Sequence, residues 1–161
     1  MIKENIIITT MKNKIEFVKQ KYDWDCGVAT TQMILKYYNI KISYEKLIQK
    51  LNANKDKGTE PNNIIKILNH YKLKTYYNDN NKLNDLKIFQ NKNALCIISY
   101  YFYDYKVDHY AILKQIKNNF VYLNDPWYGD NHKININKFN YIWKFDKKYR
   151  PQNKWICIVQ K

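Results

Sequence analysis

Arginine is the residue that this sequence most clearly lacks, and glycine and proline are also rare. Arg150 is the only arginine among 28 basic residues, and the 161 residues include three glycines and three prolines. Base-edge recognition and bidentate phosphate contacts depend largely on arginine, so the net charge of +14 does not indicate a specific nucleic-acid function. The lysines are scattered without a long basic run, which predicts only weak, nonspecific and salt-sensitive attraction to polyanions.

Cysteine is scarce too, and its placement excludes a disulfide framework. Three cysteines cannot all pair within the chain, and no spacing of cysteine and histidine residues matches a metal site. Cys96 and Cys157 lie in the apolar, strand-like runs 94–98 and 155–159, which is typical of buried core thiols. We therefore expect no metal ion, no other cofactor, and a reducing, cytoplasmic setting.

The chain also lacks any long apolar run. Residues 1–10 contain only a short isoleucine run, without a cleavage-site pattern, so they do not predict a signal peptide. No stretch approaches the roughly 20 apolar residues that a membrane-spanning helix requires. The composition, 45% hydrophobic and 16% aromatic, is nevertheless too apolar for a disordered chain. We expect a single domain over residues 1–161, with its core from about residue 14 to residue 160.

One stretch, residues 20–38, combines a polar loop, a predicted helix and a cysteine at the point where the two meet. Asp25 is a favourable N-cap residue, because its side chain can accept a hydrogen bond from a free amide of the first turn. The predicted helix carries an apolar stripe at helical spacing, formed by Ala29, Met33, Ile34 and Tyr37. Cys26 is therefore expected at the exposed amino end of a buried helix, where the helix dipole favours the thiolate.

This stretch alone allows two interpretations of Cys26. Free cysteine is among the most buried residue types, so Cys26 is a candidate core thiol. A core thiol belongs on the apolar stripe, however, whereas Cys26 lies between a carboxylate and Gly27, which lets another segment come close. The second interpretation is a reactive nucleophile, with the side-chain amide of Gln20, six residues upstream, turned toward the same point.

The sequence predicts helices first and strands afterwards. The helix that begins at Cys26 is expected to end near Asn39. Further helices are expected after the cap residues Ser43, Thr59 and Asn137, and over residues 83–89. The expected strands are residues 14–18, 73–77, 94–101, 109–116, 120–124, 134–136 and 154–160. Helices segregated from an antiparallel sheet define the α+β class.

A cysteine nucleophile requires a base, and histidine is the usual choice. The sequence has three histidines. His70 lies among polar residues near the end of a predicted helix, and His132 lies in a predicted polar loop after Gly129. His109 alone opens an apolar strand, which makes it the candidate base.

The connection at residues 117–119 decides whether Asp125 can act as a partner for His109. With a three-residue loop, Ile116 faces Phe120 and Asp125 comes to lie opposite Ala111. Because strand side chains alternate, Asp125 and His109 would then share a face and be diagonal neighbours. A two-residue turn would shift the register by one and place Asp125 on the opposite face.

Taken together, these motifs resemble a known family. Gln20, the run 25–29, the block 109–113 and Asp125-Pro126, in this order, are similar to the papain-like peptidases that process bacteriocin leaders. These form family thirty-nine of the cysteine peptidases and include many stand-alone relatives. The resemblance covers about residues 15–160 and implies a papain-like α+β fold, with N-terminal helices packed on an antiparallel sheet.

The resemblance also implies a role for each candidate residue. Cys26 would be the nucleophile, His109 the base and Asp125 the residue that orients the imidazole. The side-chain amide of Gln20 and the backbone amide of Cys26 would form the oxyanion hole. The implied function is a cysteine peptidase or thiol amidase that acts on a peptide or protein substrate through a thioacyl intermediate.

Leader peptidases of the family are usually fused to membrane transporters, so the absence of a membrane-spanning stretch favours a stand-alone relative.

Two other functions stay open at this point. The run 22–27 also resembles guanylyl-cyclase relatives built on the same fold, although a cyclase needs clustered carboxylates that hold a metal ion. A binding module that keeps the fold without turning over substrate is the other alternative.

Overall fold

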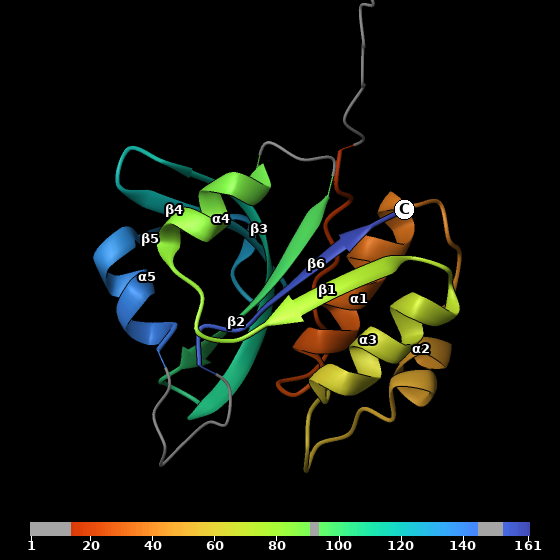
Figure 1. Cartoon of the computed structure of the whole chain (residues 1–161). Helices are drawn as coiled ribbons and strands as arrows, with labels where there is room; N and C mark the ends of the chain where they lie inside the picture. Colours follow the sequence, from red (N-terminus) through yellow and green to blue (C-terminus); the bar gives the residue numbers. More distant parts are fainter. Residues whose placement is uncertain (1–13, 91–93, 145–152) are drawn as a thin grey trace, which may run out of the picture.

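The computed structural model describes residues 14–90, 94–144 and 153–161 (Figure 1). The helices in these ranges are α1 (Cys26–Tyr37), α2 (Tyr44–Leu51), α3 (Pro61–His70), α4 (Leu83–Gln90) and α5 (Ile136–Ile142). The strands are β1 (Lys74–Asn78), β2 (Leu95–Phe102), β3 (Val107–Lys117), β4 (Phe120–Asp125), β5 (Gly129–Asn135) and β6 (Ile156–Gln160). Three helices precede the sheet, as the sequence predicted, and the α+β class is confirmed.

Within the described residues, the strands form one antiparallel sheet in the order β1-β6-β2-β3-β4-β5. The last strand of the chain, β6, is inserted between β1 and β2. Helices α1, α2 and α3 cover one face of the sheet, and α4 and α5 lie against the other (Figure 1). Because both faces are covered, all eight residues of β2 are buried, as expected of a near-continuous apolar run.

Alternate side chains of β2 enter two separate apolar clusters. Ile97 packs into the cluster beneath α1, α2 and α3, whereas Cys96 and Ile98 pack into the cluster beneath α4 and α5. Helix α1 is buried along most of its length, with Met33 and Ile34 fully inaccessible. A helix held on so many sides has a fixed position, and so does the residue at its amino end.

The helix caps follow the sequence only in part. Ser43 caps α2 as expected, because its hydroxyl accepts a hydrogen bond from the amide of Lys46 at 3.3 Å. Helix α3 has Glu60 rather than Thr59 at its N-cap, since Pro61 occupies the first helical position. Thr59 is instead buried, and its hydroxyl has no hydrogen-bond partner among the described residues.

Three further boundaries differ from expectation. The cap of α5 is Asn135 rather than Asn137, because the Asn135 side chain accepts a hydrogen bond from the Asn137 amide at 2.9 Å. Residues 14–18 form no strand; their apolar side chains pack, partly buried, against the cluster beneath α1. Residues 134 and 135 of the expected strand at 134–136 end the longer strand β5, whereas Ile136 begins α5. No described helix is both long enough and apolar enough to cross a bilayer.

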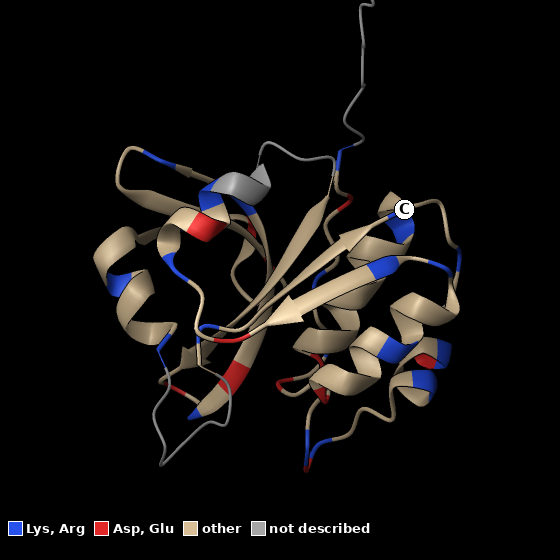
Figure 2. Ribbon diagram, viewed as in Figure 1, with Lys and Arg blue, Asp and Glu red and all other residues tan. Residues whose placement is uncertain are grey.

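In the described ranges, lysine is distributed over both halves of the molecule. Figure 2 shows these residues on helices, strands and loops alike. In the described ranges they are not concentrated on one helix or strand. This distribution agrees with the scattered lysines of the sequence.

The β3–β4 hairpin does not have the expected loop, yet it places Asp125 on the expected face. Asn118 and Asn119 form a two-residue turn, both with left-handed φ values of 51° and 63°, so Lys117 rather than Ile116 pairs with Phe120. A bulge between Leu113 and Gln115 then shifts the register back, so that Leu113 faces Leu123 and Ile112 faces Asn124. The predicted three-residue loop is wrong, and the bulge compensates for the difference.

Candidate active site

The loop before α1 is folded around the carboxylate of Asp25, which is fully buried. The carboxylate accepts hydrogen bonds from the amides of Lys21 (3.3 Å) and Tyr22 (3.0 Å) and from the hydroxyl of Tyr44 (2.8 Å). Asp25 occupies the N-cap position of α1, but its side chain makes no capping hydrogen bond, so the expected side-chain cap is wrong. A buried carboxylate needs such donors, and here they hold the chain that leads into Cys26.

Cys26 is the first residue of α1, and only 7% of it is exposed, so the expected exposed position is wrong. It lines a cleft of about 510 Å³. The aromatic and aliphatic part of the lining consists of Trp24, Pro61, Tyr105, Val107 and Tyr110. The charged part consists of Asp23, Lys55, Asp56, Lys57, Glu60, Lys106 and Asp108. The cleft therefore opens onto Cys26.

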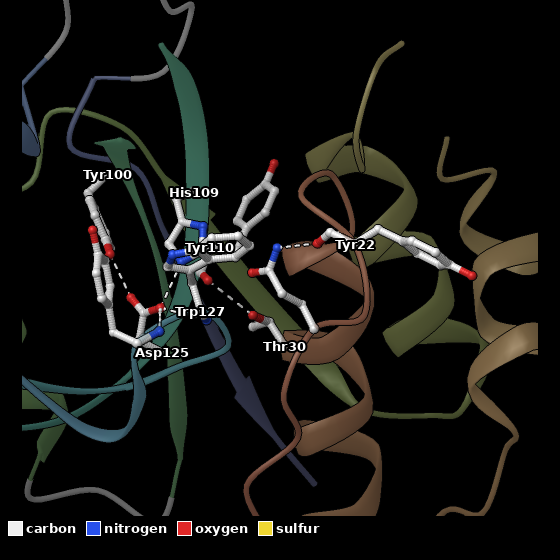
Figure 3. A network of polar contacts seen from close by, with 9 residues as sticks. Tyr22, Thr30, Tyr100, His109, Tyr110, Asp125 and Trp127 are labelled. Atoms are coloured by element: carbon white, nitrogen blue, oxygen red, sulfur yellow. Dashed lines mark hydrogen bonds and ion pairs between the residues drawn. The ribbon is translucent and has the colours of Figure 1, made fainter. Parts of the chain in front are cut away.

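His109 and Asp125 lie in direct contact inside the sheet. The Nε2 atom of His109 is 2.9 Å from Oδ1 of Asp125, and the two residues are 2% and 0% exposed (Figure 3). His109 comes from β3 and Asp125 from the end of β4, so the hairpin register described above is what joins them. The structure thus brings together the histidine and carboxylate that the sequence singled out.

The protonation of His109 is set by its two neighbours. Burial alone lowers the pKa of the imidazole, but the charge of Asp125, the charge of Cys26 and hydrogen bonds to both raise it to about 10. Since Nε2 faces Asp125, the second ring nitrogen is the one available to Cys26. The arrangement favours an imidazolium held between two acidic groups.

The carboxylate of Asp125 accepts hydrogen bonds from other donors in addition to His109. Its Oδ1 also accepts hydrogen bonds from the amides of Trp127 (2.9 Å) and Tyr128 (3.1 Å), and its Oδ2 accepts one from the hydroxyl of Tyr100 (2.6 Å). Burial raises the pKa of this carboxyl, but the charge of His109 and these hydrogen bonds lower it below its usual value. Asp125 is therefore ionised and fixed in orientation.

Gln20 reaches the same region from the loop before α1. Its backbone amide donates a hydrogen bond to the carbonyl of Pro126 at 3.0 Å, directly after Asp125 in the chain. Its side chain is buried, and Nε2 donates to the carbonyl of Tyr22 at 2.6 Å. A side-chain amide carries two N–H groups, and within the described residues only one of them has a partner, the Tyr22 carbonyl; the buried Oε1 atom has none.

Two tyrosines that contribute to this arrangement were not predicted. Tyr44 holds Asp25 and Tyr100 holds Asp125, each through its hydroxyl. Tyr100 lies in a near-continuous apolar run, and a buried tyrosine usually finds a partner for its hydroxyl. That signal was present in the sequence, but the identity of the partner depends on strand pairing.

The remaining histidines lie elsewhere. His70 is exposed and stacks edge-on against Tyr71, as its polar surroundings suggested. His132 lies in β5 rather than in a loop, is partly buried, and stacks on Tyr128 with ring centroids 4.2 Å apart. Neither histidine lines the cleft of Cys26.

Comparison with known proteins identifies the family. The sequence model of the peptidase C39 family matches residues 14–146. The chain belongs to the peptidase C39 family. No curated protein matches the sequence.

Three solved structures illustrate how the C39 domain compares with others. A double glycine motif protease from the AMS/PCAT transporter, in complex with the leader peptide, has a TM-score of 0.70, 24% identity and 91% coverage of both chains. The peptidase domain of Streptococcus ComA, a bi-functional ABC transporter of a quorum sensing pathway, has a TM-score of 0.73 and 17% identity, covering 91% of this chain and 98% of that one. A C39-like peptidase from Bacillus anthracis has a TM-score of 0.67 and 14% identity, covering 94% and 96%. These likenesses confirm the papain-like α+β fold.

The other two thiols of the C39 domain are core residues, as predicted. Cys96 is 4% exposed and Cys157 is fully buried. Burial raises the pKa of both thiols, that of Cys157 to about 12. Both are therefore protonated at neutral pH and unreactive.

We expect iodoacetamide to label only Cys26 in the folded protein near neutral pH. Cys26 lines a cleft that admits a small reagent, whereas the two core thiols are buried and protonated. Mass spectrometry of proteolytic fragments should show one labelled cysteine when the protein is folded and three when it is denatured. Comparable labelling of Cys96 or Cys157 in the folded state would contradict this prediction.

Gly27 permits the close approach of α1 to the segment before α3. A Cβ atom at this position would lie 2.5 Å from Cβ of Thr59, closer than real Cβ contacts allow. We expect Gly27→Ala to lower the free energy of unfolding by about 1–3 kcal/mol, because the two backbones must separate. Urea unfolding would measure this loss. Combination with Thr59→Gly should recover part of it, and a Gly27→Ala variant as stable as the original protein would disprove the contact.

Proposed function

We propose that this C39 domain is a cysteine peptidase that hydrolyses a peptide bond through a thioacyl intermediate on Cys26. The observation that carries the proposal is the position of His109, held at 2.9 Å by Asp125 and in contact with Cys26. The three residues come from β3, β4 and the amino end of α1, and structural packing alone does not require a histidine between a carboxylate and a thiol.

The proposed reaction begins with transfer of the Cys26 proton to His109. The thiolate attacks the carbonyl carbon of the scissile peptide bond, and the carbonyl oxygen takes up negative charge. Collapse of this intermediate breaks the C–N bond, and the imidazolium of His109 donates its proton to the leaving amine. A water molecule, deprotonated by His109, then attacks the thioester, which releases the carboxylic acid and restores the thiol.

Gln20 supplies part of the proposed oxyanion hole. One N–H of its side-chain amide is held by the Tyr22 carbonyl at 2.6 Å, which fixes the orientation of the group. The other N–H would stabilise the oxyanion together with the backbone amide of Cys26. Donors fixed before the reaction need no reorganisation, and losing one such donor typically costs about 10²–10³ in kcat.

A peptide is the proposed substrate class. The double glycine motif protease that resembles this chain was solved in complex with a leader peptide, which supports peptide binding by the shared fold. The cleft beside Cys26 has both aromatic and charged lining residues, which offer contacts to apolar and charged side chains of a peptide.

A peptidyl acyloxymethyl ketone tests the proposed nucleophile and base together. We expect this probe to form one thioether adduct, at Cys26, visible in the intact mass. The variant His109→Ala should form the adduct about 10² times more slowly, because the thiol loses its proton acceptor. His70→Ala is the matched control, since His70 is exposed on α3. Equal labelling rates in the two variants would contradict the proposed role of His109.

A further inference from the structure

Tyr100 lies on β2 and contacts both members of the His109–Asp125 pair. It pairs with His109 across β2 and β3, and the two rings meet edge to face with centroids 5.3 Å apart. Its hydroxyl donates a hydrogen bond of 2.6 Å to Oδ2 of Asp125 (Figure 3). The side chain is almost fully buried, so this contact is made away from solvent.

The two oxygens of Asp125 are bonded in different ways. Oδ1 faces His109 at 2.9 Å and also accepts hydrogen bonds from the amides of Trp127 and Tyr128. Oδ2 accepts its hydrogen bond from Tyr100. A carboxylate rotates easily about its last side-chain bond, so donors on Oδ1 alone leave the plane of the group free to tilt. The hydrogen bond on Oδ2 fixes that plane.

We propose that Tyr100 is a positioning residue for the candidate catalytic site, because its hydroxyl locks the carboxylate plane of Asp125 and thereby the imidazole of His109. This inference rests on the proposed function. Tyr100 does not line the cleft of Cys26; it lines a separate cavity of about 470 Å³ that also contains Tyr128 and His132. Tyr100 therefore acts through Asp125 and not on the substrate.

A neutral phenol is well suited to this position. A cationic donor on Oδ2 would compete with the imidazolium for the charge of Asp125, whereas a hydroxyl supplies a hydrogen bond without a second positive charge. The burial of Tyr100 and the neighbouring charge of Asp125 raise the pKa of the phenol well above its usual value, so it stays a donor. The same hydrogen bond helps to lower the pKa of Asp125.

The variant Tyr100→Phe tests the proposal, because it removes the hydroxyl and keeps the ring. With 4-nitrophenyl acetate as the substrate, we expect kcat to fall by about 10- to 100-fold, as for a lost hydrogen bond to a charged group. KM should change by less than about twofold, because Tyr100 is outside the cleft. Tyr38→Phe is the matched control, since it loses a 2.9 Å hydrogen bond to the Val159 carbonyl in β6.

Acid unfolding gives a second measurement that does not depend on catalysis. The folded pKa of Asp125 is lowered, so its ionised form stabilises the fold above the ordinary carboxyl range and the stabilisation is lost as pH falls through the folded pKa. Tyr100→Phe raises that folded pKa toward the ordinary carboxyl value, so ionised Asp125 stabilises the fold less and the acid-unfolding midpoint should lie at a higher pH than in Tyr38→Phe. This shift is expected even if the domain proves to be inactive, which separates failure of this proposal from failure of the proposed function.

Incorporation of 4-aminophenylalanine in place of Tyr100 completes the test, because its amine restores a donor on the same ring. Recovery of kcat toward the original value at neutral pH, where the arylamine is uncharged, supports the positioning role. If Tyr100→Phe does not fold, a folded aminophenylalanine protein with normal kcat still supports it. Original kcat and an unshifted midpoint in Tyr100→Phe would overturn the proposal, as would failure of the amine to restore kcat.

Discussion

Replacing Cys26 with alanine is expected to abolish peptide cleavage and leave the fold intact. Removal of the nucleophile should lower kcat on the order of 10⁶-fold, because no other described thiol lines the cleft. The stability change should be small, since alanine keeps the helix and removes a single sulfur atom. The measurement is a comparison of peptides in cells that produce the original protein or the variant, followed by hydrolysis assays on the peptides that differ.

The control for this experiment is Cys157→Ala. It removes a buried thiol from β6, away from the cleft, so it reports the effect of losing a core sulfur without touching the site. Cleavage should persist in this variant and be lost in Cys26→Ala. Unchanged hydrolysis in the Cys26 variant would end the proposal that this domain is a cysteine peptidase.

Replacing Asp125 with alanine is expected to lower kcat on the order of 10⁴-fold, the second largest effect. The carboxylate holds the imidazole of His109 at 2.9 Å and is itself fully buried, so no solvent group can replace it. Asp125→Asn should be less severe, because an amide oxygen still accepts a hydrogen bond from the protonated imidazole. The difference between the two variants separates orientation of His109 from the effect of the charge.

The same two variants should change the pH dependence of activity. The charge of Asp125 helps to raise the pKa of His109 to about 10, so the imidazolium of the original protein survives well above neutral pH. Without that charge the pKa falls, and the imidazolium is lost at a lower pH. The alkaline limb of kcat/KM should therefore move to lower pH in both variants. Asp130→Asn, an exposed acid of β5, is the control, and an unmoved alkaline limb would contradict the coupling.

The sequence predicted the candidate residues more reliably than their local surroundings. Cys26 begins α1, as the apolar stripe and the loop before it indicated. Its neighbour Asp25 was expected to cap that helix, yet its carboxylate turns back to Lys21, Tyr22 and Tyr44. A favourable cap residue is a local preference, and three donors from a folded loop and a second helix outweigh one capping bond.

The hairpin shows how a correct placement can follow from an incorrect turn. Asparagine tolerates left-handed φ values, so Asn118-Asn119 forms the two-residue turn that by itself places Asp125 on the wrong face. The bulge between Leu113 and Gln115 restores the register. A bulge depends on how β3 packs against both its neighbours and the helices, and no short pattern in the sequence specifies it.

By itself, the sequence determined the α+β class, the order of most elements and the core thiols, and it singled out the residues that we propose for thiol chemistry. These features follow from periodicity, composition and residue type, which act over a few neighbouring positions. Only the tertiary structure decided that Asp125 meets His109, that Cys26 is enclosed in a cleft, and that Tyr100 holds the carboxylate from behind. Those outcomes depend on strand register and on packing between segments far apart in the chain, where a shift of one residue reverses the direction of every side chain.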